Sequence, residues 1–152
     1  MSFADAVQRT PELTGCLKVG LQALGSNRRK IRVDATRNLT GSVDIDACLI
    51  RCYPNAPRWD YVFGYKDRVY YVEVHQGRTG EMQKVIAKLD WLRQWRERSA
   101  HSLEYLKHQS TYHWISTGRI DSAFAKNNRY RRILRQKSIF GPDPILNADA
   151  VL

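Results

Sequence analysis

Hydrophobic and polar positions repeat with two different periods along this chain, and the change of period outlines its elements. Residues 3–24 carry four leucines at helical spacing, at positions 13, 17, 21 and 24. Thr10-Pro11-Glu12 is a favourable helix start, and Gly25 to Asn27 would end the helix. A short strand is expected from Ile31 to Ala35.

Period-two alternation predicts most of the sheet. Ser42 to Ile50 alternates apolar with polar residues, which is typical of a strand. After a loop at Tyr53 to Pro57, two β-rich runs follow, at Trp59 to Tyr65 and Arg68 to His75. Only Lys66-Asp67 separates these runs, so they predict a hairpin, with a four-residue loop as the alternative because the turn lacks glycine.

The second half of the chain predicts two helices around one strand. Apolar spacing indicates a long amphipathic helix from about Thr79 to Ser99, a strand from Thr111 to Ser116, and a helix from about Asn127 to Gln136. The tail around Gly141 to Pro144 is expected to be irregular. The order is therefore α-β-β-β-β-α-β-α, an α/β fold with a mixed sheet flanked by helices, in a single domain of residues 1–152.

Composition fits a soluble globular domain with one core. The chain has 152 residues, of which 43% are hydrophobic and 26% charged. No apolar run approaches the ~20 residues needed to span a bilayer, so we expect no membrane partner, and no secretory signal is apparent at the N-terminus. The three cysteines, Cys16, Cys48 and Cys52, form no CxxC pair, so buried free thiols in a reducing cytoplasm are the expected state.

The charge balance favours a polyanionic partner. Lys and Arg number 25 against 15 Asp and Glu, which gives a formal charge of +10 and a pI of about 9.8. Such an excess attracts nucleic acid through counterion release and steering. An anionic membrane surface, or no partner at all, is the alternative on charge alone.

The predicted hairpin places two carboxylates side by side. If its tip lies between Lys66 and Asp67, Asp60 falls opposite Glu73, and His75 shares their face two positions further on. Like charges at this distance repel unless a cation lies between them, and Mg²⁺ often uses one or two carboxylates together with substrate phosphate. The alternative is a solvated face whose carboxylates are neutralised by arginines such as Arg58.

At this point the sequence resembles a known family. Asp60 followed by Val-Tyr-Tyr-Val-Glu-Val-His, which contains Glu73 and His75, is similar to the D…(D/E)xK signature of the PD-(D/E)xK, or restriction-endonuclease-like, nuclease superfamily. The helix, strand and helix that follow, up to about Gln136, match the order of that fold. The resemblance implies a metal-dependent nuclease that hydrolyses phosphodiester bonds of DNA or RNA, with Mg²⁺ or Mn²⁺ held by Asp60 and Glu73.

One position departs from the family pattern. The lysine of the motif falls on His75, which could act as a base or contact the metal. Members of the superfamily sometimes carry this lysine on the following helix, where Lys84 and Lys88 lie one turn apart. The remaining alternative is a fold that has lost catalysis and only binds.

Two further acidic residues are weaker candidates. The family often adds an acidic residue from its first helix, and Glu12 is the one available, although a favourable charge at a helix N-terminus explains it as well. Asp44 and Asp46 form a rival pair on one strand face. If the core strands are shifted, Asp46 is the first replacement.

Basic and aromatic residues predict a nucleic-acid surface. Trp91 and Trp95 are interleaved with cations on the long helix, an arrangement that suits stacked bases, although one tryptophan in the core is the plainer interpretation. The arginines expected to contact phosphate are Arg93, Arg96, Arg129, Arg131, Arg132 and Arg135. A solvated basic face is the alternative.

Three hypotheses follow from the sequence. The first is a metal-dependent nuclease that uses Asp60, Glu73 and His75 with Lys84 or Lys88. The second is a catalytically degenerate nuclease fold that binds nucleic acid, DNA before RNA, or a protein partner. The third is an unrelated basic protein that binds an acidic protein. Many members of the superfamily dimerise to cut two strands, so a homodimer is a further possibility.

Overall fold

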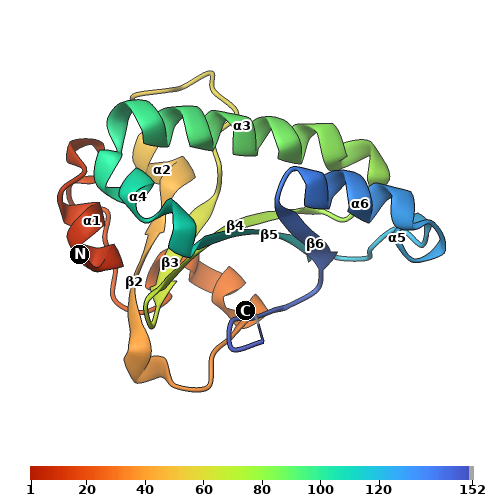
Figure 1. Ribbon diagram of the computed structural model, residues 1–152, viewed down its shortest axis with the longest axis horizontal. Helices are drawn as coiled ribbons and strands as arrows, with labels where there is room; N and C mark the ends of the chain where they lie inside the picture. The colour runs from red at the N-terminus through yellow and green to blue at the C-terminus, as the bar shows by residue number, and fades with distance from the viewer. Residues whose placement is uncertain (151–152) are drawn as a thin grey trace.

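A five-stranded mixed sheet is the centre of the fold (Figure 1). The computed structural model describes residues 1–150. The strands lie in the order β2-β3-β4-β5-β6, so chain neighbours are also neighbours in the sheet. Their bounds are β2 (Leu39–Asp44), β3 (Tyr61–Tyr65), β4 (Arg68–Gln76), β5 (Ser110–Thr117) and β6 (Ile139–Asp143). The predicted α/β class with a mixed sheet flanked by helices is confirmed.

The hairpin of β3 and β4 has the predicted register. Tyr65 pairs with Arg68 and Tyr61 pairs with Val72, so the tip is the two-residue turn Lys66-Asp67. Lys66 adopts a φ of 57°, the left-handed conformation that a tight hairpin turn requires and that glycine usually supplies. The shorter of the two loops considered is therefore the one that forms.

Parallel pairing builds the other half of the sheet. β4 pairs with β5 and β5 with β6, both parallel, so helices must return the chain between them. The first return uses α3 (Met82–Ser99) and α4 (His101–Tyr105), and the second uses α5 (Ala123–Lys126) and α6 (Asn128–Gln136). Figure 1 shows α3 and α6 on the same face of the sheet.

Each face of the sheet has its own apolar core. Toward the helices, alternate strand residues such as Val62, Tyr71 and Trp114 pack with Leu89 of α3 and Leu134 of α6. The opposite face is covered by η2 (Gln22–Lys30) and by a small parallel pair, β1 (Ile31–Arg32) with β7 (Leu146–Asn147). Buried residues on both faces explain why the central strands read as continuous apolar runs.

The predicted helix over the leucines of residues 3–24 is wrong. The segment forms α1 (Phe3–Gln8), η1 (Pro11–Leu13) and irregular turns before η2. Gly15 and Gly20 have φ values of 78° and 53°, which interrupt any helix. Leu13 packs in the helix-side core and Leu24 in the opposite one, so tertiary packing rather than one helical face produces the leucine spacing.

The predicted strand Ser42 to Ile50 is also wrong in its second half. β2 ends at Asp44, whose carboxylate accepts a hydrogen bond from the backbone N–H of Ala47 at 2.9 Å. Aspartate is a favoured N-cap because it satisfies a free N–H of the first turn. The chain therefore turns into α2 (Ile45–Leu49), and Asp46 lies on a helix.

The tail is more regular than expected. β6 runs through Gly141 and Pro142, which are joined by a cis peptide bond, and pairs with β5. A side chain at Gly141 would overlap the carbonyl oxygen of Trp114, so this strand can approach β5 only with glycine here. The expectation of an irregular segment at Gly141 to Pro144 is corrected accordingly.

The cysteines correct another expectation. Cys16 and Cys48 form a disulfide, with Cα atoms 6.2 Å apart, which joins the segment after η1 to α2. Cys52 is the free cysteine and it is exposed. The expectation of buried free thiols is therefore wrong for Cys16 and Cys48, which are bonded to each other, whereas Cys52 is free as expected but not buried.

Within residues 1–150, no helix combines the length and the apolar composition needed to cross a membrane.

Candidate functional site

Asp60 and Glu73 meet where the hairpin opens. Asp60 immediately precedes β3, and its backbone N–H donates to Oε1 of Glu73 at 3.1 Å. In return, the backbone N–H of Val74 donates to Oδ2 of Asp60 at 3.0 Å. Each carboxylate is thus anchored by the backbone of the other strand, and each keeps its second oxygen free for another partner.

Lys88 reaches both carboxylates from helix α3. Its Nζ lies 2.5 Å from Oε2 of Glu73 and 3.7 Å from Oδ1 of Asp60. Glu73 is fully buried, whereas the side chains of Asp60 and Lys88 are about one-fifth exposed. Because a buried carboxylate is costly without a partner, Lys88 is the principal counterion of Glu73.

Burial sets the electrostatics of this group. Desolvation, followed by the negative charge of Glu73, raises the pKa of Asp60 to about 7. Desolvation by itself disfavours the charged form of Lys88, but the carboxylates of Glu73 and Asp60 outweigh it and raise the pKa of Lys88. A crowded carboxylate with a raised pKa beside a lysine is typical of functional sites.

His75 adds a second charged link on the same face. Its Nδ1 lies 3.4 Å from Oε2 of Glu73, and its Nε2 lies 3.0 Å from Oε1 of Glu81. The hydrogen bond with Glu73 is the main reason that the pKa of His75 is raised. The hydrogen bond between His75 and Glu81 lowers the pKa of Glu81. Because the two carboxylates favour its protonated form, the imidazole of His75 is better suited to carry a positive charge than to act as a general base.

The two candidate lysines of the long helix have different surroundings. Lys84 is 69% exposed and its Nζ lies 3.4 Å from Oε2 of Glu81, while Lys88 occupies the space between Asp60 and Glu73. Lys84 therefore neutralises Glu81 instead of contacting the carboxylate pair.

Asp46 lies beside the site with a cation of its own. Nε of Arg58 is 2.9 Å from Oδ1 of Asp46, and the Nη1 group of Arg58 donates to the carbonyl oxygen of Tyr53 at 2.6 Å. The backbone N–H of Ile45 donates to the carbonyl oxygen of Asp60 at 2.8 Å, which holds α2 against the hairpin. Arg58 thus neutralises Asp46. The cation that neutralises Asp60 and Glu73 is Lys88 and not Arg58.

Glu12 has a different environment. Its Oε2 accepts a hydrogen bond from the hydroxyl of Tyr53 at 3.1 Å, and that hydroxyl also lies 3.5 Å from Oγ of Ser99. Glu12 therefore takes part in a contact between η1, the loop before β3 and the end of α3.

Only some of the arginines predicted to form a basic surface are exposed in the structure. Arg96 is buried, and its Nε donates to Oε1 of Glu104 at 2.7 Å. Its guanidinium also lies 5.4 Å from the ring centre of Tyr71. Arg96 is a core residue, and its assignment as a surface phosphate contact is corrected. Arg93 is partly buried, with its guanidinium 5.2 Å from the ring centre of Tyr112.

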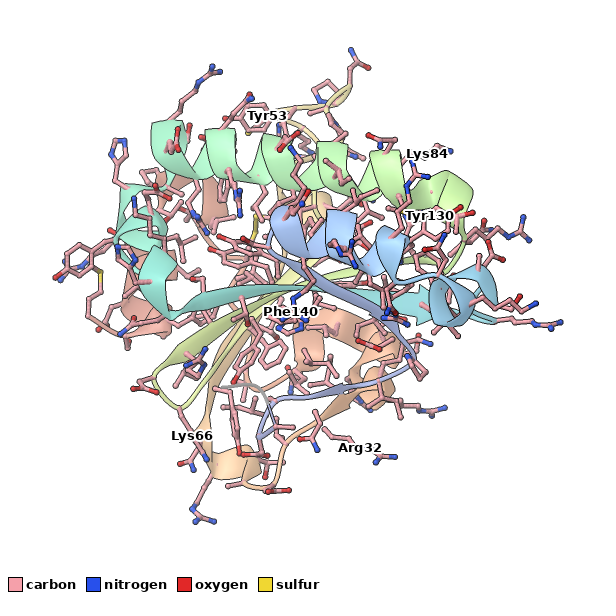
Figure 2. The ribbon with its side chains drawn as sticks, turned by 45° about the vertical axis from the view of Figure 1, so that its right-hand side comes forward. Arg32, Tyr53, Lys66, Lys84, Tyr130 and Phe140 are labelled. Carbon is pink, nitrogen blue, oxygen red and sulfur yellow. A yellow bond between two sulfur atoms is a disulfide. The ribbon has the colours of Figure 1, made fainter. Side chains whose placement is uncertain are left out.

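Helix α6 keeps an exposed basic face. Arg129, Arg132 and Arg135 are exposed, and Arg135 lies over the ring of Phe140 at 4.5 Å. Arg131 is partly buried and forms a 3.6 Å ion pair with Asp143. Figure 2 shows Tyr130 of α6 and Lys84 of α3 toward the same end of the helical layer. Helices α3 and α6 lie on the same face of the sheet, with these two residues toward one end of it.

The tryptophans belong mainly to the core. Trp95 is buried, and its ring stacks on Trp91 with centroids 6.0 Å apart. Trp91 in turn meets Tyr53 edge to face at 5.8 Å. Their rings are thus used within the protein, which agrees with the plainer interpretation of this pair.

The site has two convergent acidic ligands for a cation. Within residues 1–150, no group of three or more His, Cys, Asp and Glu side chains is arranged to hold a metal ion. Oδ1 of Asp60 and Oε2 of Glu73 nevertheless face one cation, the Lys88 ammonium. Carboxylate oxygens are the ligands that Mg²⁺ prefers, and water and substrate oxygens usually complete its shell. In donor chemistry the two carboxylates fit such an ion, and the position where it would bind is the one that the Lys88 ammonium occupies.

Comparisons with protein-family models, curated proteins and solved structures found no match.

One participant was not found in the sequence. Glu81 lies between His75 and Lys84, with its carboxylate 3.0 Å and 3.4 Å from their respective nitrogens. It precedes α3 in the segment Thr-Gly-Glu, where an acidic residue commonly serves the helix N-terminus. Because the helix N-terminus is enough to explain an acidic residue here, nothing in the sequence indicated its contact with His75.

Proposed function

We propose that this protein is a metal-dependent nuclease, with Asp60 and Glu73 as the metal ligands and Lys88 as the assisting lysine. The observation that carries the proposal is the convergence of Asp60, Glu73 and Lys88 from β3, β4 and α3 on one partly open point. Two strand carboxylates alone occur on many hairpins. A helix lysine placed between them is the arrangement expected from the resemblance if this chain, like some members of the superfamily, carries the motif lysine on the following helix.

Each side chain has a role that follows from its surroundings. Asp60 and Glu73 would hold Mg²⁺ or Mn²⁺, which supplies a Lewis acid for the phosphoryl oxygen and lowers the pKa of bound water. Lys88, relieved of part of its pairing with Glu73, would stabilise negative charge that develops on the phosphate. His75, held between Glu73 and Glu81, would fix the orientation of Glu73 and contribute positive charge.

The net charge and the exposed arginines of α6 support a nucleic-acid substrate. The chain carries a formal charge of +10, and Arg129 and Arg132 are exposed without an ion pair among residues 1–150. Counterion release from phosphates would provide most of the affinity. DNA is the substrate proposed first, with RNA as the alternative.

The test is isothermal titration of Mg²⁺ and Mn²⁺ with plasmid and oligonucleotide cleavage on the same samples. The variant is Asp60→Asn with Glu73→Gln, which keeps the size of both side chains and removes their charge. Asp67→Asn with Glu97→Gln removes the same charge from exposed positions and is the matched control. The proposal predicts that metal uptake and cleavage vanish together in the first variant and persist in the control.

A catalytically inactive nucleic-acid-binding module is the second candidate. The observation that favours it is that Lys88 already neutralises Asp60 and Glu73 without a metal. Salt-sensitive binding to oligonucleotides with neither metal uptake nor cleavage in the wild-type protein would select it and reject the nuclease.

A further inference from the structure

A polar cavity lies at the carboxyl ends of β4 and β5, beside the candidate site. The last residues of these strands, Gln76 and Thr117, are paired, so the loops that follow leave the sheet together. They enclose a cavity of about 340 Å³ lined by Gln76, Arg78, Thr117, Gly118, Arg119 and Asp121. The carboxyl ends of parallel strands are a common place for ligands in α/β sheets.

The walls of this cavity are fixed by hydrogen bonds. The backbone N–H of Asp121 donates to the carbonyl oxygen of Gly77 at 2.8 Å, and Oδ2 of Asp121 accepts from the N–H of Thr79 at 3.0 Å. Gly77 is buried, and a side chain there would overlap Oγ of Ser116. The two loops are therefore joined in one arrangement, so a ligand would not have to order them.

Two arginines without an ion-pair partner among residues 1–150 give the cavity a positive charge. Arg78 and Arg119 are both exposed, and within residues 1–150 neither guanidinium has an ion-pair or hydrogen-bond partner. Arg58, Arg96 and Arg131, in contrast, each pair with a carboxylate.

The one carboxylate in the lining does not cancel this charge. Asp121 already accepts the Thr79 N–H, and two arginines line the same cavity. Nζ of Lys30 reaches the same edge from the opposite face of the sheet, 3.4 Å from the carbonyl oxygen of Ser116. The cavity therefore favours an anion with several acceptor oxygens, which the planar guanidinium fork binds in pairs of hydrogen bonds.

The distance from the carboxylate pair suggests which anion. Gln76 follows Glu73 by three residues on β4, which corresponds to about 10 Å of strand at ~3.3 Å per residue. This length is short enough for a strand of a few nucleotides to span it, since the rise of a duplex is ~3.4 Å per nucleotide. A strand whose phosphate lies at Glu73 can thus place a nearby phosphate in this cavity.

We propose that Arg78 and Arg119 form a phosphate-binding subsite for the strand cleaved at Asp60 and Glu73, an inference that rests on the proposed nuclease function. The subsite would fix the register of the strand, since phosphate contacts position a nucleic acid without reading its sequence. Its ligand is a phosphate group, either an internal diester or the monoester at a strand end.

The test measures binding without cleavage, by fluorescence anisotropy of labelled oligonucleotides in EDTA. We expect Arg78→Gln with Arg119→Gln to weaken binding at least ten-fold at low salt and to reduce the slope of log affinity against log salt by about 1–2. Arg9→Gln with Arg37→Gln removes the same charge from two exposed positions, the C-cap of α1 and the short helix η3 (Thr36–Asn38). This control is expected to change affinity much less.

Oligonucleotides with a single neutral methylphosphonate identify the phosphate. Moved along the strand, this group should weaken wild-type binding at one position and have no further effect there in the Arg78→Gln, Arg119→Gln variant. If no internal methylphosphonate weakens binding, and binding weakens only when a 5′ or 3′ monophosphate is removed, the ligand is the monoester at the strand end. Equal responses of the arginine variant and its control, or additive losses at every phosphate, would overturn the subsite.

The two proposals fail in different ways. Binding that depends on the cavity in a protein that neither takes up metal nor cleaves would reject the nuclease and keep the subsite. Cleavage that depends on Asp60 and Glu73 but not on Arg78 and Arg119 would keep the nuclease and reject the subsite.

Discussion

The ammonium of Lys88 lies 2.5 Å from Oε2 of Glu73, a carboxylate with no exposed surface on the central strand of the sheet. Glu73 and Lys88 are 15 residues apart, and the packing of α3 on the sheet brings them together. The contact joins stability to function, because the partner that makes the buried charge tolerable is also the lysine proposed to assist cleavage.

Replacing Lys88 is expected to destabilise the fold. Lys88→Met leaves the Glu73 carboxylate buried without its main counterion, so the free energy of unfolding should fall by roughly 3 kcal/mol. Lys84→Met, one turn earlier and largely exposed, should change it by less than about 0.5 kcal/mol. Urea denaturation at neutral pH compares the two, and equal losses would show that Lys88 does not support Glu73.

Asp60 should make the protein less stable as the pH rises. Its pKa is about 7 in the fold, above the ordinary value of 3.8, because of burial and then Glu73. The folded state therefore binds more protons between these values, and stability is lost as pH increases through this window, by at most about 4 kcal/mol.

Asp60→Asn removes this titration. The variant is expected to match the wild type near pH 4 and to be the more stable protein at pH 8 in EDTA. Thermal unfolding across this range measures the difference. A variant that is less stable than the wild type at pH 8 would indicate that Lys88 and the hydrogen bond from Val74 favour the charged form of Asp60 more than burial and Glu73 oppose it.

Local patterns predict the hairpin and the long helix because each is determined largely by its own residues. The alternation of apolar positions fixes which residues share a face, and the two-residue tip fixes the register, so Asp60 and Glu73 could be paired from sequence. Asp44 shows the limit of this reasoning. Its side chain caps α2, and this ends a strand that alternation alone would continue to Ile50.

The identity of the site lysine could not be obtained from the sequence. Lys84 and Lys88 lie on similar faces of α3, and the choice between them depends on how the helix sits over β4. Arg96 illustrates the same point, since a long polar side chain reads as exposed until Glu104 and two tyrosines are seen to surround it. Tertiary packing decides both cases.

The Cys16–Cys48 disulfide should stabilise the fold. It closes a loop across 32 residues of sequence, and the loss of chain entropy in the unfolded state corresponds to roughly 3–4 kcal/mol. Thiol titration of the denatured, unreduced protein should count one free cysteine. Cys16→Ser with Cys48→Ser should lower the urea midpoint, whereas Cys52→Ser, at an exposed free cysteine, should not. A count of three thiols, or equal stability of all variants, would contradict this prediction.

His113 should make the fold sensitive to acid. Its ring stacks on Phe140 with centroids 5.4 Å apart, and its Nε2 lies 2.8 Å from Oγ1 of Thr111. Burial, followed by the charge of Arg68, lowers the pKa of His113 from 6.5 to about 4. The unfolded chain then binds more protons than the folded one between these values, so stability decreases as pH falls through this window, by up to about 3 kcal/mol.

His113→Gln isolates this contribution from those of other groups that titrate in acid. Urea denaturation at pH 7.5 and pH 4.5 should show a smaller loss of stability in the variant than in the wild type. His108→Gln, which removes an exposed histidine, is the matched control and should lose as much stability as the wild type, because it leaves the buried ring of His113 in place. If the His113 variant and the His108 control lose the same amount, protonation of the buried ring is not what weakens the fold in acid.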